Sequence, residues 1–277
     1  MNGKTYSSKL LAIEAITVLI GLLFLVPFYF VLTNSFKSLG DLMSNTASLP
    51  GDLSLANYFR AWSVLDFPRV LLNSVIITVC SNLSLILFSS MTAYRLVRRP
   101  GKINQTLFYL FVAAMIIPFQ AIMLPLVKFS SWFGLMNSLT GIIVIYTGMG
   151  VSFCIILYHG FIKSVPLEIE EAAAADGCNP YRLFWGIVFP LLKPMTVSIV
   201  VLQSMWIWND FLLPLLYLQK AEQRTLQLSI YTLFGEYAKQ WDLALAALVM
   251  IMIPILLLYF VLQRYVVNGI MVGAVKG

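Results

Sequence analysis

Few side chains in this 277-residue sequence have the types and spacing that catalysis needs. The single histidine, His159, has no second metal ligand at a suitable spacing, and Cys80, Cys154 and Cys178 form no CxxC pair. We interpret these four as packing residues. Gly3-Lys4-Thr5 matches only the end of the GxxxxGK[ST] phosphate-binding loop, and the sequence has neither an HExxH zinc motif nor paired aspartates in apolar segments. The sequence therefore predicts a chain without a catalytic centre, metal or cofactor of its own.

The most distinctive polar stretch runs from Glu171 to Gly177 and reads Glu-Ala-Ala-Ala-Ala-Asp-Gly. Pro166 suits the first turn of a helix, alanine favours helix strongly, and Gly177 tolerates the left-handed backbone that closes a helix. Asn179-Pro180 then predicts a new helix start, with a cap followed by proline. We expect a short helix, a sharp turn and a second helix. The carboxylates that complement the positive end of the first helix are Glu168, Glu170 and Glu171.

This short helix has an unusual surface. Glu171 and Ala175 share a face by their i,i+4 spacing, and Ala172 and Ala173 add little bulk beside it. One interpretation is an amphipathic connector that rests on lipid headgroups. Interfacial helices usually carry basic residues and large apolar residues instead, and an anionic membrane repels acidic charge. We therefore favour a peg that fits a cleft in a partner protein.

The composition places nearly all of the remaining chain in lipid. Hydrophobic residues make up 60% of the sequence and charged residues only 11%, whereas a soluble domain has about 25% charged residues. Apolar runs of the length that crosses a bilayer recur along the chain. We expect one all-α membrane domain over 1–277, with six transmembrane helices and a cytoplasmic segment at about 164–190 between spans four and five. The expected spans are 10–32, 70–94, 103–127, 139–158, about 195–218, and 243–262. Four prolines are expected to kink helices: Pro118, Pro125, Pro190 and Pro194.

Lysine and arginine set the expected orientation, because basic residues in short loops stay in the cytoplasm. With the N-terminus inside, eleven basic residues face the cytoplasm and seven face outward. We also expect the first span to be retained, since no small-residue cleavage signature follows it. The net charge of +6 suits an anionic inner leaflet and gives no indication of nucleic acid. The inner set is Lys4, Lys9, Arg95, Arg98, Arg99, Lys102, Lys163, Arg182, Lys193, Arg264 and Lys276, and the outer set is Lys37, Arg60, Arg69, Lys128, Lys220, Arg224 and Lys239.

A few polar residues within the apolar segments are candidates for a substrate path. Asp210 is the one acidic residue well inside a span-like segment, and Trp206 and Asn209 lie beside it. The alternative, which we favour, is that this group marks the outer membrane interface, where tryptophan is enriched. Gln203, Asn82 and Gln120 are expected to face a polar cavity or to bond another helix.

The acidic segment resembles the EAA motif of importer-type ATP-binding-cassette (ABC) permeases. The matching positions are Glu171-Ala172-Ala173, Gly177, Ile187 and Pro190, and Phe189 replaces the customary leucine before the proline. Other stretches resemble the carbohydrate-uptake permeases of the maltose-transporter type over essentially the full length. These are Asn57-Tyr58, Asn73-Ser74, Trp208-Asn209-Asp210-Phe211, Gly269 and 273–277.

The resemblance implies a type I ABC importer permease in a bacterial or archaeal cytoplasmic membrane, with both termini inside. It implies four kinds of partner: a second homologous permease, two cytoplasmic ATPases that use ATP and magnesium, an external solute-binding protein, and the bilayer. Glu171 would pair with a basic residue in a groove of an ATPase. The residues it assigns to ATPase coupling are Glu171, Ala172, Ala173, Asp176, Gly177, Ile187 and Pro190, with Gly273, Lys276 and Gly277 as further ATPase contacts.

Two alternatives stay open from the sequence. An ion-coupled secondary transporter should carry several buried carboxylates or inverted repeats, and only Asp210 approaches that description. An ABC importer permease for a non-sugar solute, such as glycerol-phosphate, would share all the features above.

Overall fold

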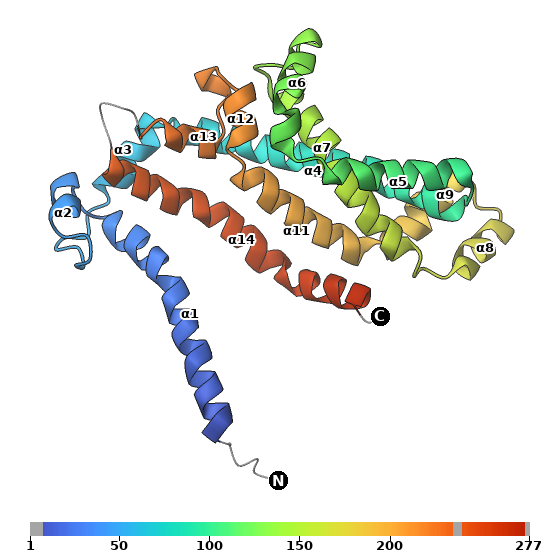
Figure 1. Cartoon of the computed structure of the whole chain (residues 1–277), viewed down its shortest axis with the longest axis horizontal. Coiled ribbons are helices and arrows are strands. Elements are labelled where there is room, and N and C mark those ends of the chain that lie inside the picture. The colour runs from blue at the N-terminus through green and yellow to red at the C-terminus, as the bar shows by residue number, and fades with distance from the viewer. Residues whose placement is uncertain (1–7, 235–239, 275–277) are drawn as a thin grey trace. The chain divides into compact units, whose positions relative to one another are not determined.

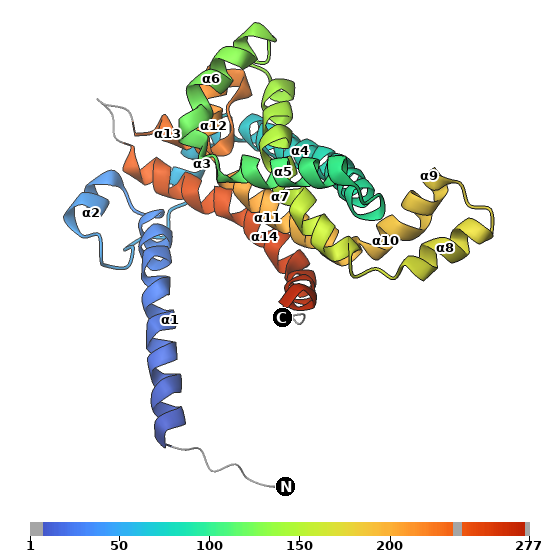
Figure 2. The ribbon, with the colours of Figure 1, turned by 45° about the vertical axis from the view of Figure 1, so that its right-hand side comes forward.

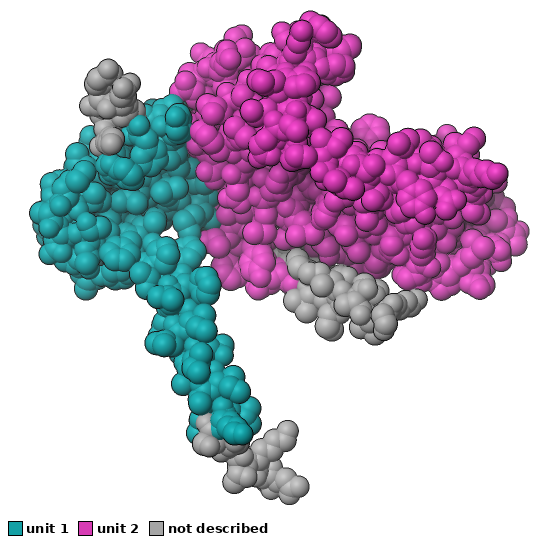
Figure 3. Space-filling view, viewed as in Figure 1, with its two compact units in different colours: residues 1–67, 230–253 teal, residues 68–229, 254–277 magenta. Residues whose placement is uncertain are grey.

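The computed structural model describes residues 8–234 and 240–274, with side chains described for 9–261 and 263 within those ranges. Every regular element in these residues is helical (Figure 1), which confirms the predicted all-α fold. The chain divides into two compact units, which Figure 3 colours separately. The first contains 1–67 and 230–253, and the second contains 68–229 and 254–277.

The first unit contains α1 (Ser8–Asn34), an apolar helix that is long enough to cross a membrane. No residue in its most apolar stretch is buried against the rest of the protein. Such a fully exposed apolar surface suits lipid or another membrane protein. After α1 the chain is held by Lys37, whose Nζ donates to the carbonyl oxygens of Asn45 at 2.9 Å and Ser48 at 2.5 Å. Asn57 donates to the carbonyl of Lys37 at 2.7 Å. These bonds tie the connection into one folded loop. This unit also contains α2 (Leu39–Ser44), α3 (Ala56–Val64) and the first part of α14 (Trp241–Ala274), up to Ile253.

The second unit has its core among three long helices. They are α4 (Phe67–Arg98, with Pro68 onward in this unit), α7 (Leu139–Ile162) and α11 (Lys193–Asn209). Leu85, Tyr146, Tyr158 and Ile199 are completely buried in this core. The hydroxyl groups of Tyr158 and Thr196 lie 2.9 Å apart and join α7 to α11. The shorter elements are α8 (Leu167–Ala175), α9 (Pro180–Leu183), the π-helical turn η1 (Phe184–Val188), α10 (Phe189–Leu191) and η2 (Ala221–Gln223), and α13 (Leu226–Tyr231) runs from this unit into the first.

Four of the six predicted spans correspond to single helices. The predicted segments 10–32, 70–94, 139–158 and 243–262 lie within α1, α4, α7 and α14 (Trp241–Ala274). Within the described residues, four helices are long and apolar enough to cross a membrane, and the number reaches six if each of two bent helix pairs is one span.

The kink expected at Pro118 is a sharp break in the predicted span 103–127. The chain forms α5 (Lys102–Ile116) and α6 (Phe119–Trp132), which meet at an angle of 104°. Proline disfavours helical backbone at the residue before it, and Ile117 is accordingly extended, with ψ at 116°. Pro118 therefore ends α5, whereas Pro125 is accommodated inside α6.

The helix observed in the predicted span at about 195–218 is shorter than that span. α11 ends at Asn209, Asp210 is extended with ψ at 131°, and a separate helix, α12 (Leu212–Tyr217), follows. At its other end, α11 bends by 71° from the segment 180–191. Pro190 and Pro194 flank this bend and cannot donate backbone hydrogen bonds, which accounts for the expected kink.

A close backbone approach at the start of α7 provides a test of this packing. A Cβ atom on Gly141 would lie 1.8 Å from the carbonyl oxygen of Leu135, so we expect Gly141→Ala to destabilise the protein by about 1–3 kcal/mol. The apparent Tm in detergent should fall by roughly 3–10 °C. Gly160→Ala, on the same helix with no atom within 4 Å, should cause no loss. An equal Tm for both variants would contradict this packing.

Candidate functional site

The acidic segment folds into the expected helix, turn and helix. α8 begins after Pro166, one residue later than predicted, and Asp176 caps its end. Gly177 has φ at +80°, the left-handed conformation that glycine adopts at low cost. The Cys178 N–H donates to the carbonyl of Ala173 at 3.1 Å and completes the turn. Figures 1 and 2 show α8 and α9 at one end of the second unit, away from α6 and α12.

The two faces of α8 differ in exposure. Glu170 and Ala173 are buried, with 6% and 8% of their surfaces exposed. Glu171 is exposed on the other side of the helix. Ala173, which the resemblance assigns to an ATPase contact, therefore packs against the protein's own core. The assigned residues that are exposed here are Glu171, Ala172, Asp176, Gly177 and Pro190.

The buried carboxylate of Glu170 binds two residues at the end of α4. The Tyr94 hydroxyl donates to Oε2 at 2.7 Å, and Nε of Arg98 donates to Oε1 at 2.8 Å. Nη2 of Arg98 also donates to the carbonyl of Val165 at 2.9 Å. Both carboxylate oxygens and two guanidinium nitrogens are thus paired away from water, the geometry in which ionic hydrogen bonds are strong.

The second helix begins as the sequence predicts and then widens. The Asn179 side chain accepts a hydrogen bond from the backbone N–H of Arg182 at 2.8 Å, and Pro180 occupies the first turn. In η1 the Phe189 N–H donates to the carbonyl of Phe184, five residues back. Ile187 lies in this turn, half-buried against the core.

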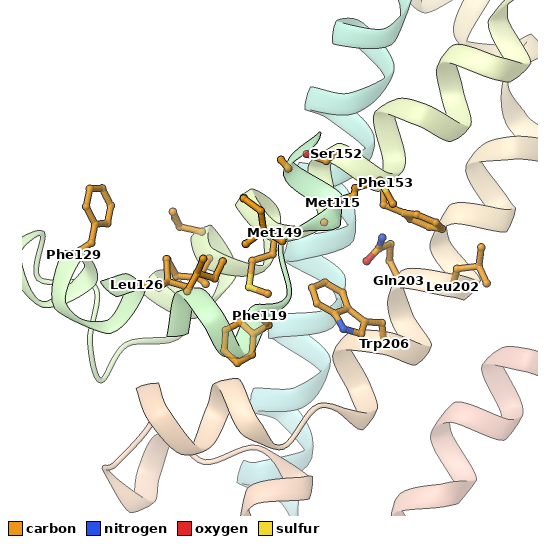
Figure 4. Close-up of a pocket in the computed structure, with 17 residues that line it drawn as sticks. Met115, Phe119, Leu126, Phe129, Met149, Ser152, Phe153, Leu202, Gln203 and Trp206 are labelled. Atoms are coloured by element: carbon orange, nitrogen blue, oxygen red, sulfur yellow. The ribbon is translucent and has the colours of Figure 1, made fainter. Parts of the chain in front are cut away.

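A cavity of about 900 Å³ lies in the second unit, between α5, α6, α7 and α11 (Figure 4). No lining residue is charged. The break at Ile117 contributes to its wall, and Gly148 on α7 borders open space, since a Cβ atom added there would meet no atom within 4 Å. The labelled lining residues are Met115, Phe119, Leu126, Phe129, Met149, Ser152, Phe153, Leu202, Gln203 and Trp206.

Two of the predicted substrate-path residues line this cavity. Gln203 is 4% exposed, and its Nε2 lies 3.4 Å from Sγ of Cys154, while Oε1 has no hydrogen-bond partner among the described residues. Trp206, one turn further along α11, packs edge-on against Tyr146 at 5.5 Å. Together they supply an amide and an indole ring to a largely apolar space, whose other polar side chain is Ser152.

The other polar candidates lie elsewhere. Asn82 is buried and donates to Oγ of Ser204 at 3.2 Å, so it joins α4 to α11. Gln120 and Asn209 are exposed, and Nδ2 of Asn209 bonds the carbonyl of Met205 in its own helix. None of these three lines the cavity.

Asp210 has a structural environment. Its Oδ1 accepts the backbone N–H of Leu212 at 3.0 Å, and its Oδ2 accepts the Tyr146 hydroxyl at 2.9 Å. The carboxylate thus caps the break between α11 and α12 and anchors it to α7. This geometry gives Asp210 a role in the fold, beside the interfacial position expected from the sequence.

Sequence reasoning missed the roles of Tyr94, Arg98 and Glu170. Arg98 entered only as a topological charge and Glu170 only as a complement to the helix dipole. One local signal existed, because Glu170 and Ala173 are three residues apart and share a face opposite Glu171. The pairing partner, 72 positions away, had no such signal.

The ATPase contacts expected near the C-terminus are not tested by the described side chains. Gly273 belongs to α14 but its surroundings lie outside the described side chains, and Lys276 and Gly277 lie outside the described residues. Among the residues whose side chains are described, no three His, Cys, Asp or Glu side chains gather as a metal site would require.

Comparison with known proteins gives matches along most of the chain. Residues 85–272 match the family described as the binding-protein-dependent transport system inner membrane component. The chain is 44% identical over 261 residues to the probable starch degradation products transport system permease protein AmyC of Thermoanaerobacterium thermosulfurigenes, covering 94% of each. It is 39% identical to the melibiose/raffinose/stachyose import permease protein MelC of Bacillus subtilis, covering 91% of each.

A solved structure shows the same fold. A chain of a bacterial ABC transporter involved in the import of the acidic polysaccharide alginate superposes with a TM-score of 0.81. The match covers 94% of this chain and 99% of that one, at 23% sequence identity. The likeness confirms the predicted importer-permease fold.

Proposed function

Because the chain belongs to the family of binding-protein-dependent transport system inner membrane components, we propose that it passes a sugar or an oligosaccharide through the membrane. The chain is a multi-pass membrane protein and a permease subunit of an ABC importer, in which a separate chain hydrolyses ATP. The relatives named above carry starch degradation products or melibiose, raffinose and stachyose in their names, which supports a sugar as cargo.

The observation that carries the proposal is the uncharged cavity of about 900 Å³. Ligand sites usually measure about 300–1,000 Å³ and combine apolar walls with a few polar groups. Trp206 offers a flat ring to the apolar face of a sugar, and Gln203 offers an amide to its hydroxyl groups. A phosphate ester would meet no cationic side chain on these walls. We therefore propose a neutral sugar rather than glycerol-phosphate as the cargo.

The exposed surface of α8 is the proposed ATPase contact. Glu171 presents an acidic group at the surface. The exposed residues Ala172, Asp176 and Gly177 have short side chains or none, so little projects from the surface around it. With both termini in the cytoplasm, as the distribution of basic residues favours, α8 faces the compartment that holds ATP. We propose that two ATPase subunits, using ATP and magnesium, bind this permease and a second homologous permease, and that an external binding protein delivers the cargo.

Cargo specificity can be tested with the complete complex in proteoliposomes. We expect the binding protein with melibiose, raffinose or maltotriose to raise ATP hydrolysis several-fold above the rate without sugar. Glycerol 3-phosphate should give no stimulation. Stimulation by glycerol 3-phosphate alone would contradict the sugar assignment while leaving the ABC importer function intact.

Charge reversal on α8 tests the ATPase contact. Losing one partner of an interfacial charge pair costs about 2–5 kcal/mol, so Glu171→Lys should reduce the ATPase that copurifies with the permease by at least tenfold. Sugar uptake should fall equally. Glu222→Lys is the matched control, because Glu222 is an exposed glutamate in η2 on the opposite side by the predicted topology. Normal ATPase retention by Glu171→Lys would exclude this contact.

Narrowing the cavity tests the substrate path. Gly148→Leu adds four carbons toward open space, so the variant should fold normally while uptake falls at least fivefold. Gly160→Leu makes the same change on the same helix outside the cavity and should transport normally. Basal ATP hydrolysis should be unaffected in both variants. Full uptake by Gly148→Leu would place the path elsewhere.

A further inference from the structure

We propose that Tyr94, Arg98 and Glu170 form a clamp through which a displacement of α8 moves the end of α4. This inference rests on the proposed role of α8 as the ATPase contact. It identifies the residues through which a movement imposed on α8 by the ATPase would reach a membrane-spanning helix. The chain itself connects α8 only to α7 and, through α9, η1 and α10, to α11. The clamp gives α8 a direct connection to a third long helix, 72 residues away in sequence.

The end of α4 contacts the acidic segment at three points. Before α8, Nη2 of Arg98 bonds the carbonyl of Val165. Within α8, Tyr94 and Arg98 bond the two oxygens of Glu170. After α8, the Tyr94 ring packs against Phe184 of η1, with ring centroids 5.1 Å apart. Because these contacts lie before, within and after α8, the helix cannot shift as a rigid body without moving α4 or breaking them.

Burial makes the clamp stiff. The side chains of Arg98 and Glu170 are only 15% and 7% exposed, so water does not readily replace either partner. Removing one member of a buried pair leaves an uncompensated charge, which is strongly unfavourable. The Arg98 fork also fixes direction, since its two nitrogens bond acceptors on different segments. An exposed pair of the same charges would yield under a small displacement.

Consecutive glutamates on α8 therefore have separate roles. Adjacent helical residues point about 100° apart, and Glu170 faces inward whereas Glu171 faces outward. Glu171 receives the ATPase in the proposed function. Glu170 passes the resulting movement to Arg98 and Tyr94. Both Arg98 and Tyr94 are positioning residues, which transmit movement and do not contact the cargo.

Conservative variants test the clamp without leaving a buried charge unpaired. Tyr94→Phe keeps the packing on Phe184 and loses one hydroxyl, and Arg98→Lys keeps the charge and loses the fork. Arg95→Lys and Tyr109→Phe make identical changes at exposed positions and serve as controls. Each variant is assembled with its ATPases, and three quantities are measured: copurified ATPase, ATP hydrolysis, and uptake of the sugar that most stimulates the wild type.

We expect both clamp variants to retain the ATPase and to hydrolyse ATP within about twofold of wild type. Sugar taken up per ATP hydrolysed should fall at least fivefold, and the double variant should fall little further because both changes break one unit. The controls should match wild type. A cargo-free readout is amide hydrogen exchange at the end of α4, which a non-hydrolysable ATP analogue should alter in wild type and not in the double variant.

Two results would overturn the clamp. Unchanged uptake per ATP in both variants, with unchanged exchange at α4, would show that transmission takes another route. Loss of copurified ATPase together with a lower Tm would show that the three residues only support the docking surface. Neither result would remove the proposed function, which depends separately on Glu171→Lys and on the sugar panel.

Discussion

A backbone N–H or C=O group in hydrocarbon needs a partner within the protein, and both the long helices and their breaks follow from this requirement. α4 and α7 satisfy it by continuous helix. Where a helix ends, fewer backbone groups are left without a hydrogen bond than the break would otherwise leave. Pro118 has no N–H to satisfy, and the Asp210 carboxylate accepts the N–H of Leu212. The first break also opens space, since Ile117 and Phe119 beside it line the cavity. The same constraint thus shapes the fold and the proposed substrate path.

The clamp and the cavity lie on the same set of helices. α4 carries Arg98 at one end and Leu85 further along, and a Cβ on Gly150 would approach Leu85 to 3.0 Å and Oε1 of Gln203 to 3.3 Å. Gly150 lines the cavity wall. A movement of α4 would therefore displace Leu85, whose side chain lies against Gly150 in that wall. Close packing of this kind transmits displacement because it leaves little room for local accommodation.

Sequence rules succeeded where the cause is local. Gly177, Asn179 and Pro180 act on their own backbone or on residues three positions away, so the turn after α8 was predictable. Apolar length likewise fixed α1, α4, α7 and α14. The rules failed where distant residues decide. The bond of Asp210 to Tyr146 and the choice of Glu170 as the buried carboxylate each depend on partners that no spacing rule identifies.

The π-helical turn η1 has a consequence for how chain length can vary in this segment. Its Phe189-to-Phe184 bond encloses one more residue than an α-helical turn. Deletion of one residue within η1 would let the turn close as an α-helix, and the segments on either side would keep nearly the same rotation, since the wide turn covers about the same angle with one more residue. Deletion of one residue from α-helical backbone, as in α8, would instead rotate the residues before it by about 100°. The turn η1 is therefore a place where the chain between Gly177 and Pro190 can change length by one residue while Glu171 keeps its direction.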